Sequence, residues 1–311
     1  MKQPLIKAYA AALIYACIIG FSFLFVTIAL ESANPLDLLA HRFTIAFAAA
    51  TLILAVKRPS FSIRWSDLLK IMPLALLYPT GFFVFQTFGL VFTTSSEAGI
   101  VQATVPIMTV FLASVLLRER SSFMQKIALA VSSVGVIFML LMGGMSGASF
   151  SLIGISLILL SALCAALYNI FARSLTKAYS LLLLTYVMTC FGFIAFNGLS
   201  IGRHLVEGTL SSWWVPMADG RYLLSVLYLG LLSSLVTSFL SNYALSVLEA
   251  AKMSVFSHIA TLITIIAGVL FLHESLGYYH VLGGIAILGG VIVTNLPAAR
   301  KAKEHPSHSA S

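Results

Sequence analysis

One stretch of the sequence decides the fold, and the chain contains it twice. The first copy is SSEAGIVQATVPIMTVFLASVLLRER, residues 95–120, and the second is AAKMSVFSHIATLITIIAGVLFLHES, residues 250–275. A constant offset places Thr109 on Thr264, and the order of apolar runs before and after each copy also repeats. A repeat of this size indicates two structural halves, neither of which completes a core alone.

The composition around these copies predicts an integral membrane protein. Hydrophobic residues make up 60% of the chain and charged residues only 9%. Soluble domains carry about 25% charged residues, so this chain has too few to cover a surface that faces water. Its apolar runs are continuous over about 20 residues, which is the length of a membrane-spanning helix and not of a barrel strand.

Ten apolar runs are predicted as membrane-spanning helices. They cover about 7–30, 36–56, 68–92, 95–117, 123–142, 151–174, 179–200, 222–246, 250–272 and 278–296. The predicted fold is therefore an all-α integral membrane protein with ten transmembrane helices in two inverted five-helix repeats. The predicted boundaries are 1–145 for the first repeat, 146–298 for the second and 299–311 for a disordered tail.

The placement of basic residues predicts the orientation in the membrane. Most Lys and Arg residues fall in loops that share one side with both termini, whereas Arg203 and Arg221 fall on the other side. Because basic loops stay in the cytoplasm, both termini are expected to be cytoplasmic in a multi-pass protein of the inner or plasma membrane. The net charge of +8 is explained by these loops, and no nucleic-acid partner is expected.

An odd number of spans in each half makes the two repeats insert with opposite orientations. Inverted repeats of this kind are typical of transporters that work by alternating access, with the substrate site near the midplane between the halves. The pattern therefore predicts a central cavity formed by spans three, four, eight and nine, with help from spans one and six.

Three motifs in this order resemble the EamA family of the drug/metabolite transporter superfamily. They are PLDLLAHRF at 35–43, TVPIMTVFLASVLLRER at 104–120 and ALYNIFARSL at 166–175. The resemblance implies efflux of small metabolites, often amino acids or related compounds, without a soluble ATPase. The second half departs from the pattern where Ala260–Thr261 stands opposite Val105–Pro106, which makes the two halves mechanically unequal.

Ten residues are predicted to line the substrate cavity because polar amides and aromatic side chains recur at the centres of spans. They are Tyr78, Phe82, Phe85, Gln86, Gln102, Tyr168, Asn169, Asn242, Ser257 and His258. Interhelical packing is the alternative interpretation for each of them. His258, with no carboxylate one turn away, is also the one candidate for proton coupling.

Six further residues are predicted to have gating or structural roles: Arg42, Glu97, Pro106, Glu119, Lys252 and Glu274. Proline removes a helix hydrogen bond, so a kink is expected near Pro106. Glu119 and Glu274 end their helices, where a negative charge opposes the helix dipole. Each is therefore expected to have a basic or backbone N–H partner.

Arg42 has two interpretations. A charge inside a span is costly and usually paired or directed into a cavity, so Arg42 is a candidate for holding a substrate carboxylate or closing an outer gate. The alternative, favoured by its shallow depth, is that it reaches the outer headgroups or pairs with Glu31 or Asp37.

No enzyme, cofactor or metal motif was found: HExxH, Walker A and GxSxG are all absent. The predicted function is export of small amphipathic metabolites, with the substrate and the lipid bilayer as partners. The alternatives are a membrane scaffold, or an enzyme acting on a lipid-linked substrate through His273, Glu274 and His280. Small residues in spans five and ten leave a monomer and a homodimer both open.

Overall fold

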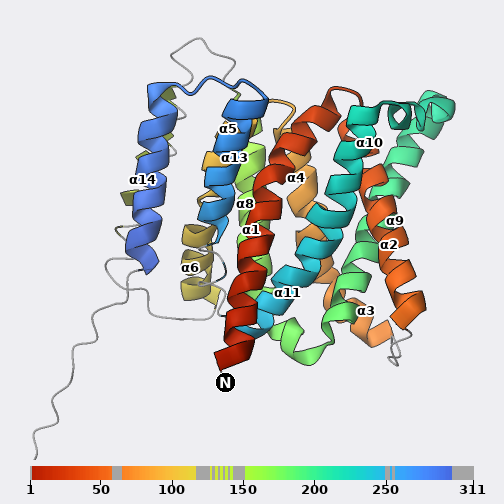
Figure 1. The fold of residues 1–311 in the computed structure, drawn as a ribbon, viewed down its shortest axis with the longest axis horizontal. Coiled ribbons are helices and arrows are strands. Elements are labelled where there is room, and N and C mark those ends of the chain that lie inside the picture. The colour runs from red at the N-terminus through yellow and green to blue at the C-terminus, as the bar shows by residue number, and fades with distance from the viewer. Residues whose placement is uncertain are drawn as a thin grey trace, which may run out of the picture.

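The computed structural model describes residues 2–57, 65–116, 151–248, 253 and 256–295, with isolated positions between 127 and 142. Every regular element in these ranges is helical, which confirms the all-α prediction for them. The long helices stand side by side in a bundle (Figure 1). Glu119, Lys252 and most of the predicted fifth span lie outside the described residues.

The first half of the described chain contains seven helical elements. They are α1 (Lys2–Leu30), α2 (Pro35–Lys57), α3 (Trp65–Ala75), η1 (Leu76–Gly81), α4 (Phe82–Gly89), α5 (Ser95–Gln102) and α6 (Val105–Leu116). A capping box starts α5, because Thr94 accepts a hydrogen bond from the Glu97 backbone and Glu97 accepts one in return.

The second half begins with the long helices α8 (Leu152–Ala178) and α9 (Leu181–Glu207). It continues with η2 (Leu210–Ser212), η3 (Val215–Ala218), α10 (Gly220–Leu227), η4 (Tyr228–Val236), α11 (Thr237–Val247), α13 (Ser257–Phe271) and α14 (Tyr278–Asn295). The N-caps of α8, α9 and α10 are Ser151, Ser180 and Asp219, whose side chains each accept a backbone hydrogen bond.

Seven helical stretches in the described ranges are long and apolar enough to cross a membrane. They are Gln3–Leu30, Pro35–Lys57, Trp65–Gly89, Ser95–Leu116, Leu152–Ala178, Leu181–Glu207 and Gly220–Val247. The helix Ser257–Phe271 is apolar but shorter. These stretches make the chain a multi-pass membrane protein, while the count of ten spans stays a prediction.

Corresponding spans of the two halves carry an irregular π-helical segment at the same place. When the offset that joins Thr109 to Thr264 is applied, η1 falls within η4. At Tyr78 the backbone leaves the helical region altogether, with φ −143° and ψ 118°. Helical periodicity therefore does not continue across this break.

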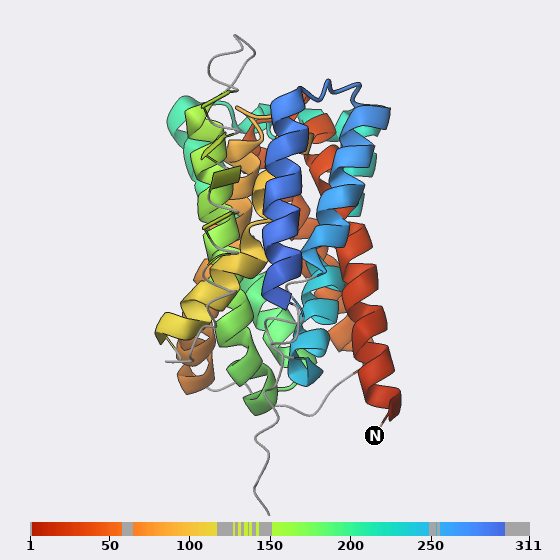
Figure 2. The ribbon, with the colours of Figure 1, turned by 90° about the vertical axis from the view of Figure 1, so that its left-hand side faces the viewer.

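Close packing of α1 against α13 brings the two halves together. Thr264 of α13 donates a hydrogen bond of 2.9 Å to the Gly20 carbonyl of α1. A Cβ atom at Gly20 would lie 2.6 Å from the Cβ of Ile263, so only glycine allows this approach. Figure 2 shows α13 standing beside α1 along much of its length.

Candidate functional site

A small cavity lies where helices from both halves meet at the centre of the bundle. Its walls come from α1, from η1 and α4, from α5 and α6, from α8 and from α13. The space open to the centres of water molecules is about 30 Å³. One water needs about 10–15 Å³ by this measure, so the cavity has room for water but not for a metabolite.

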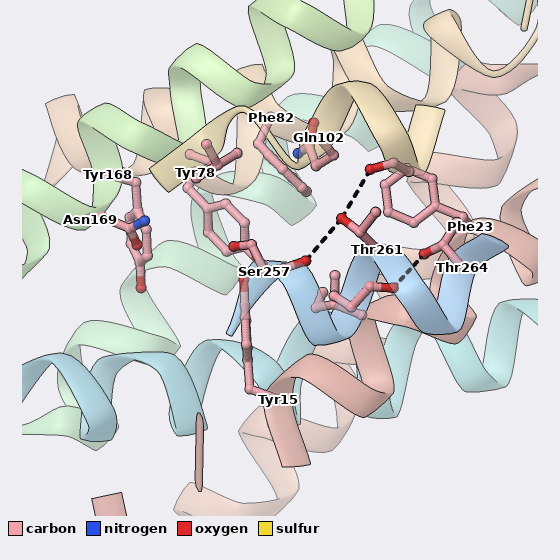
Figure 3. A pocket seen from close by; sticks show the side chains of 15 residues that line it. Tyr15, Phe23, Tyr78, Phe82, Gln102, Tyr168, Asn169, Ser257, Thr261 and Thr264 are labelled. Carbon is pink, nitrogen blue, oxygen red and sulfur yellow. Dashed lines mark hydrogen bonds between the residues drawn. The ribbon is translucent and has the colours of Figure 1, made fainter. Parts of the chain in front are cut away.

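Six of the residues predicted to bind substrate lie in the cavity wall (Figure 3). They are Tyr78, Phe82, Gln102, Tyr168, Asn169 and Ser257. They come from four segments that are far apart in the sequence, and the wall combines aromatic faces with amide and hydroxyl groups. Such a lining suits a ligand that is partly apolar and partly polar.

The other four predicted residues do not line the cavity. Phe85 packs against a neighbouring hydrophobic cluster, and Gln86 is buried with no hydrogen-bond partner for its amide in the described part of the chain. His258 is next to Ser257 but is absent from the lining, and neither of its ring nitrogens has a partner among the described residues. Helical geometry turns consecutive residues by about 100°, so Ser257 and His258 face different surroundings.

Asn242 does not line the cavity but accepts a hydrogen bond from Tyr168, which does. The Tyr168 hydroxyl donates to the Asn242 Oδ1 at 2.8 Å and lies 2.8 Å from the Ser241 hydroxyl. The Asn242 amide nitrogen donates to Thr185 at 3.1 Å. The prediction that span eight lines the cavity is thus wrong. The helix α11 lies behind Tyr168 and fixes the position of its ring through these hydrogen bonds. The centre of the Tyr168 ring lies 4.7 Å from the centre of the Tyr78 ring.

The sequence predicted that spans one and nine contribute to the cavity, but it named no lining residue of α1 and only Ser257 of those in α13. Tyr15, Ile19 and Phe23 of α1 line the cavity, as do Thr261 and Thr264 of α13. The repeat carried a signal for α13, because Thr261 stands opposite Pro106 in the first copy and Thr264 opposite Thr109. The α1 residues had no such signal, since aromatic side chains occur throughout that span.

The predicted kink near Pro106 is confirmed as a break between α5 and α6. The helix α5 ends at Gln102, and α6 starts at Val105. Gln102 is buried, and its Oε1 atom has no hydrogen-bond partner within the described residues. Across the cavity, Thr261 donates to the Gly99 carbonyl at 3.0 Å and ties α13 to α5. The Oε1 of Gln102 is therefore a hydrogen-bond acceptor without a described partner, next to the contact that joins α13 to α5.

Arg42 of α2 is fully buried, with none of its side chain exposed. Its Nε donates to the Ser234 hydroxyl at 2.6 Å, and its Nη2 donates to the Ser233 hydroxyl at 2.8 Å. The guanidinium carbon lies 3.8 Å from the centre of the Phe83 ring. The interpretation in which Arg42 reaches the outer headgroups or pairs with Glu31 or Asp37 is wrong. Its side chain is fully buried, and its hydrogen bonds in the described structure go to Ser233 and Ser234 of η4.

Glu274 and Glu97 join α5 to the turn between α13 and α14. The Glu274 carboxylate accepts hydrogen bonds from the backbone N–H groups of Ser95 and Ser96, at 2.7 and 2.8 Å. Glu274 thus has the backbone partners expected of it, and it caps the positive end of the α5 dipole. Glu97 lies 3.0 Å from the Nε2 of His280. We call these contacts the α5 latch.

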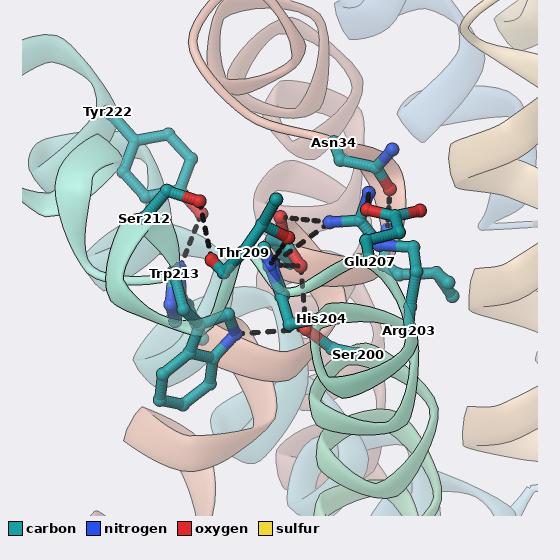
Figure 4. A network of polar contacts seen from close by, with 12 residues as sticks. Asn34, Ser200, Arg203, His204, Glu207, Thr209, Ser212, Trp213 and Tyr222 are labelled. Carbon is teal, nitrogen blue, oxygen red and sulfur yellow. Dashed lines mark hydrogen bonds and ion pairs between the residues drawn. The ribbon is translucent and has the colours of Figure 1, made fainter.

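A second polar network joins α2 to α9 (Figure 4). Asp37 accepts hydrogen bonds from Ser200 at 2.6 Å and from Arg203 at 2.8 Å, and it lies 3.1 Å from His204. Trp213 donates to Ser200 at 2.9 Å and extends the network into the segment before α10. Figure 1 shows that the starts of α2 and α5 and the end of α9, which carry these contacts, lie at the end of the bundle opposite the N-terminus.

The proposed enzymatic trio does not form a reactive site. Glu274 is engaged by backbone N–H groups, and the Nδ1 of His280 accepts from the Gly277 backbone while its Nε2 faces Glu97. His273 occupies the left-handed backbone region with φ 53°, which turns the chain from α13 back toward α5. No cluster of His, Cys, Asp and Glu suited to a metal occurs in the described ranges.

Comparisons with known proteins agree with the membrane architecture. A model of the EamA-like transporter family matches residues 6–141 and 152–296. The chain is 50% identical over 303 residues to a protein of Bacillus subtilis (strain 168) named uncharacterized transporter YcxC, with 97% of each chain covered. It is 28% identical over 278 residues to an uncharacterized transporter of Archaeoglobus fulgidus, with 88% of this chain and 94% of that one covered.

A solved structure has a similar fold. A crystal structure with 18% sequence identity superimposes with a TM-score of 0.64 and covers 95% of this chain and 97% of that one. At this identity the likeness concerns the fold alone.

Proposed function

The chain belongs to the EamA-like transporter family, and from this premise we propose that it carries a small amphipathic metabolite through the central cavity by alternating access. The family and the names of the relatives make the protein a transporter and not an enzyme. The substrate class, the direction and the mechanism are the parts that we propose.

The main support for this proposal is that helices from both halves form the cavity wall. Helices α1, α4 and α5 belong to the first family match, and α8 and α13 belong to the second. A site shared between two halves changes its access when the halves move against each other. Both halves also have an irregular segment in the corresponding span, η1 and η4, where a helix can bend at low cost.

The small volume of the cavity fits an occluded state of such a cycle. Its roughly 30 Å³ leaves no room for a metabolite, so substrate entry requires the walls to separate. We propose that the α5 latch and the Asp37 network close the outer end of the bundle, with both termini in the cytoplasm. Opening of this end then requires the Glu274 carboxylate to leave the start of α5.

We also propose that transport does not use a proton-carrying residue in the cavity. None of the described residues that line the cavity is acidic, and His258 is not among them. Facilitated exchange driven by the substrate gradient therefore suits the wall better than coupling through His258. The resemblance to the family favours outward movement of amino acids or related compounds.

Counterflow in proteoliposomes tests this function. Vesicles with purified protein are preloaded with single unlabelled compounds from three classes, zwitterionic amino acids, organic acids and organic amines, and entry of the labelled compound is measured. Ala165→Phe places a large ring in the cavity wall and is expected to abolish counterflow. Ala48→Phe, at an exposed position of α2, is the matched control and is expected to retain it.

Two results would contradict the proposal. Counterflow that survives Ala165→Phe would mean that the substrate takes another path. Absence of counterflow for all three classes, with protein that unfolds cooperatively, would contradict transport of small amphipathic metabolites.

A further inference from the structure

The charge of Arg42 has no counter-charge in the described part of the chain. Its hydrogen-bond acceptors there are the hydroxyls of Ser233 and Ser234 and the Ser233 carbonyl. The third nitrogen, Nη1, is buried and has no partner among these residues. The nearby carboxylate of Asp37 is engaged by α9 instead. A guanidinium in apolar surroundings is costly unless it is paired, so its environment lacks one anion.

Arg42 lies well inside the membrane-spanning part of the bundle. It follows the start of α2 at Pro35 by about two turns, which is about 10 Å along the helix axis. The Gly230 position of η4 packs directly on its backbone, because a Cβ atom there would lie 2.8 Å from the Arg42 carbonyl oxygen. The Arg42 side chain is fully buried and donates hydrogen bonds to Ser233 and Ser234 of η4, so it does not reach the membrane surface.

Two aromatic side chains, Phe83 and Tyr78, separate Arg42 from the cavity. The guanidinium stacks on Phe83, the centre of the Phe83 ring lies 5.2 Å from the centre of the Tyr78 ring, and Tyr78 lines the cavity. Tyr78 is also the residue at which the helix is broken. A change in backbone angles at this break moves the Tyr78 ring, which packs against the Phe83 ring that covers the guanidinium.

We infer that Arg42 is an anion-binding residue and that its ligand is a carboxylate group of the transported substrate, an inference that rests on the proposed function. The carboxylate pairs with Nη1 when the Tyr78 and Phe83 rings move aside. The apolar body of the substrate remains against Tyr15, Phe82 and Tyr168, and its other polar groups meet Gln102 and Ser257. The substrate is thus an amphipathic carboxylic acid that carries a full negative charge at one end.

A purely structural role for Arg42 makes a different prediction. If the guanidinium only links α2 to η4, its replacement lowers stability but does not change which ligands bind. The decisive measurement is therefore the preference for an acid over its own amide, because the two compounds differ only in the group that Arg42 would recognise. Affinity for a ligand is read from the rise in unfolding temperature of purified protein, independently of transport.

The experiment uses three matched pairs as probes: phenylalanine and phenylalaninamide, leucine and leucinamide, and 3-phenylpropionate and 3-phenylpropionamide. For the wild type, at least one acid is expected to stabilise the protein and to bind about a hundredfold more tightly than its amide, as for a desolvated charge pair. Arg42→Gln is expected to abolish this preference. Arg42→Lys keeps a charge without the planar fork and is expected to reduce the preference about tenfold.

Two control variants separate recognition from folding. Ser257→Ala changes the cavity wall without touching Arg42 and is expected to weaken acid and amide equally. Ser225→Ala removes a buried hydroxyl that donates to the Arg221 carbonyl of its own helix, and it is expected to keep the preference. If Arg42→Gln does not fold, the decision rests on Arg42→Lys, which must lower the preference, against Ser225→Ala, which must not.

The inference is overturned if no acid stabilises the wild type, if the amide binds as well as the acid, or if Arg42→Gln keeps the preference. Counterflow on the same proteins separates this failure from that of the proposed function. Counterflow of an amine or amide with no acid preference would support the carrier and reject the anion site. Acid binding that needs Arg42, without any counterflow, would support the site and reject the carrier.

Discussion

The carboxylates of the α5 latch and the Asp37 network have hydrogen-bond partners, whereas two polar atoms at the centre of the bundle do not. At the end of the bundle opposite the N-terminus, Asp37, Glu97 and Glu274 each have at least two hydrogen-bond partners from other segments or from their own helix start. At the centre, the Gln102 Oε1 and the Arg42 Nη1 are buried without a partner in the described residues.

Together with the proposed function, this difference distinguishes carboxylates that join helices from the central groups that we propose to bind the substrate. A buried polar atom without a hydrogen bond is costly, and a bound substrate would supply the missing partner. A carboxylate with several donors is stabilising only while the elements that it joins remain together. The comparison therefore predicts that changes at these carboxylates affect stability and that changes at the centre affect substrate binding.

The largest expected effect on stability is at the α5 latch. Glu274→Ala removes the acceptor of two backbone N–H groups at the start of α5 and is expected to cost about 1–3 kcal/mol. Gly268→Ala should have a similar effect, because a Cβ atom there would collide with the Glu274 carboxylate and lie 2.6 Å from the Ser96 hydroxyl. Thermal unfolding in detergent measures both changes.

Matched controls exist for both substitutions. Glu207→Ala removes an exposed carboxylate whose ion pair, among the described residues, is with Arg203 of its own helix. Gly198→Ala places a methyl group where no neighbouring element of the described structure lies within 4 Å. Each control is expected to change stability by less than about 0.5 kcal/mol. A latch variant that is as stable as its control would show that these contacts do not join α5 to α13.

A smaller effect is expected at Gln102, and it should appear in transport alone. Because its Oε1 has no partner in the described structure, Gln102→Ala removes no internal hydrogen bond at that atom. The unfolding temperature should therefore change little. The KM in counterflow is expected to rise about fivefold, as for the loss of one hydrogen bond of about 1 kcal/mol. A large loss of stability with an unchanged KM would mean that Gln102 is a structural residue.

The smallest effect concerns Asp219, which caps α10 outside the membrane-spanning segments. A hydrogen bond from Ser32 of 2.6 Å, and then one from the Arg221 backbone, lower the pKa of this carboxyl. A lowered pKa in the folded state adds stability above the unfolded pKa, and this stability is lost as the pH falls through the folded pKa.

Ser32→Ala tests this contribution. The variant is expected to be slightly less stable than the wild type at neutral pH, and the difference should shrink as the pH falls through the range in which the Asp219 carboxyl takes up its proton. Unfolding temperatures measured across this pH range give the comparison. A difference that is constant with pH would assign the effect of Ser32 to packing.

The sequence predicted the helical class, most span boundaries and six residues of the cavity wall. It succeeded where the deciding property is local, as with the break before Pro106 and the amide of Gln102. In the third span, Tyr78 and Phe82 line the cavity as predicted, whereas Phe85 and Gln86 do not. The prediction failed for His258 because spacing alone does not say which side of a helix faces the cavity.

The sequence by itself determined that this protein is a membrane protein built from a repeated set of helices. Only helices and closed barrels satisfy their backbone groups in lipid, and continuous apolar runs of about 20 residues indicate helices. Only the tertiary structure decided which polar groups are free. Arg42 lies near Asp37 in the sequence, yet Asp37 pairs with α9 and Arg42 with η4. Hydrogen bonds require partners within about 3 Å, and the partners of a buried charge come from segments that only folding brings together.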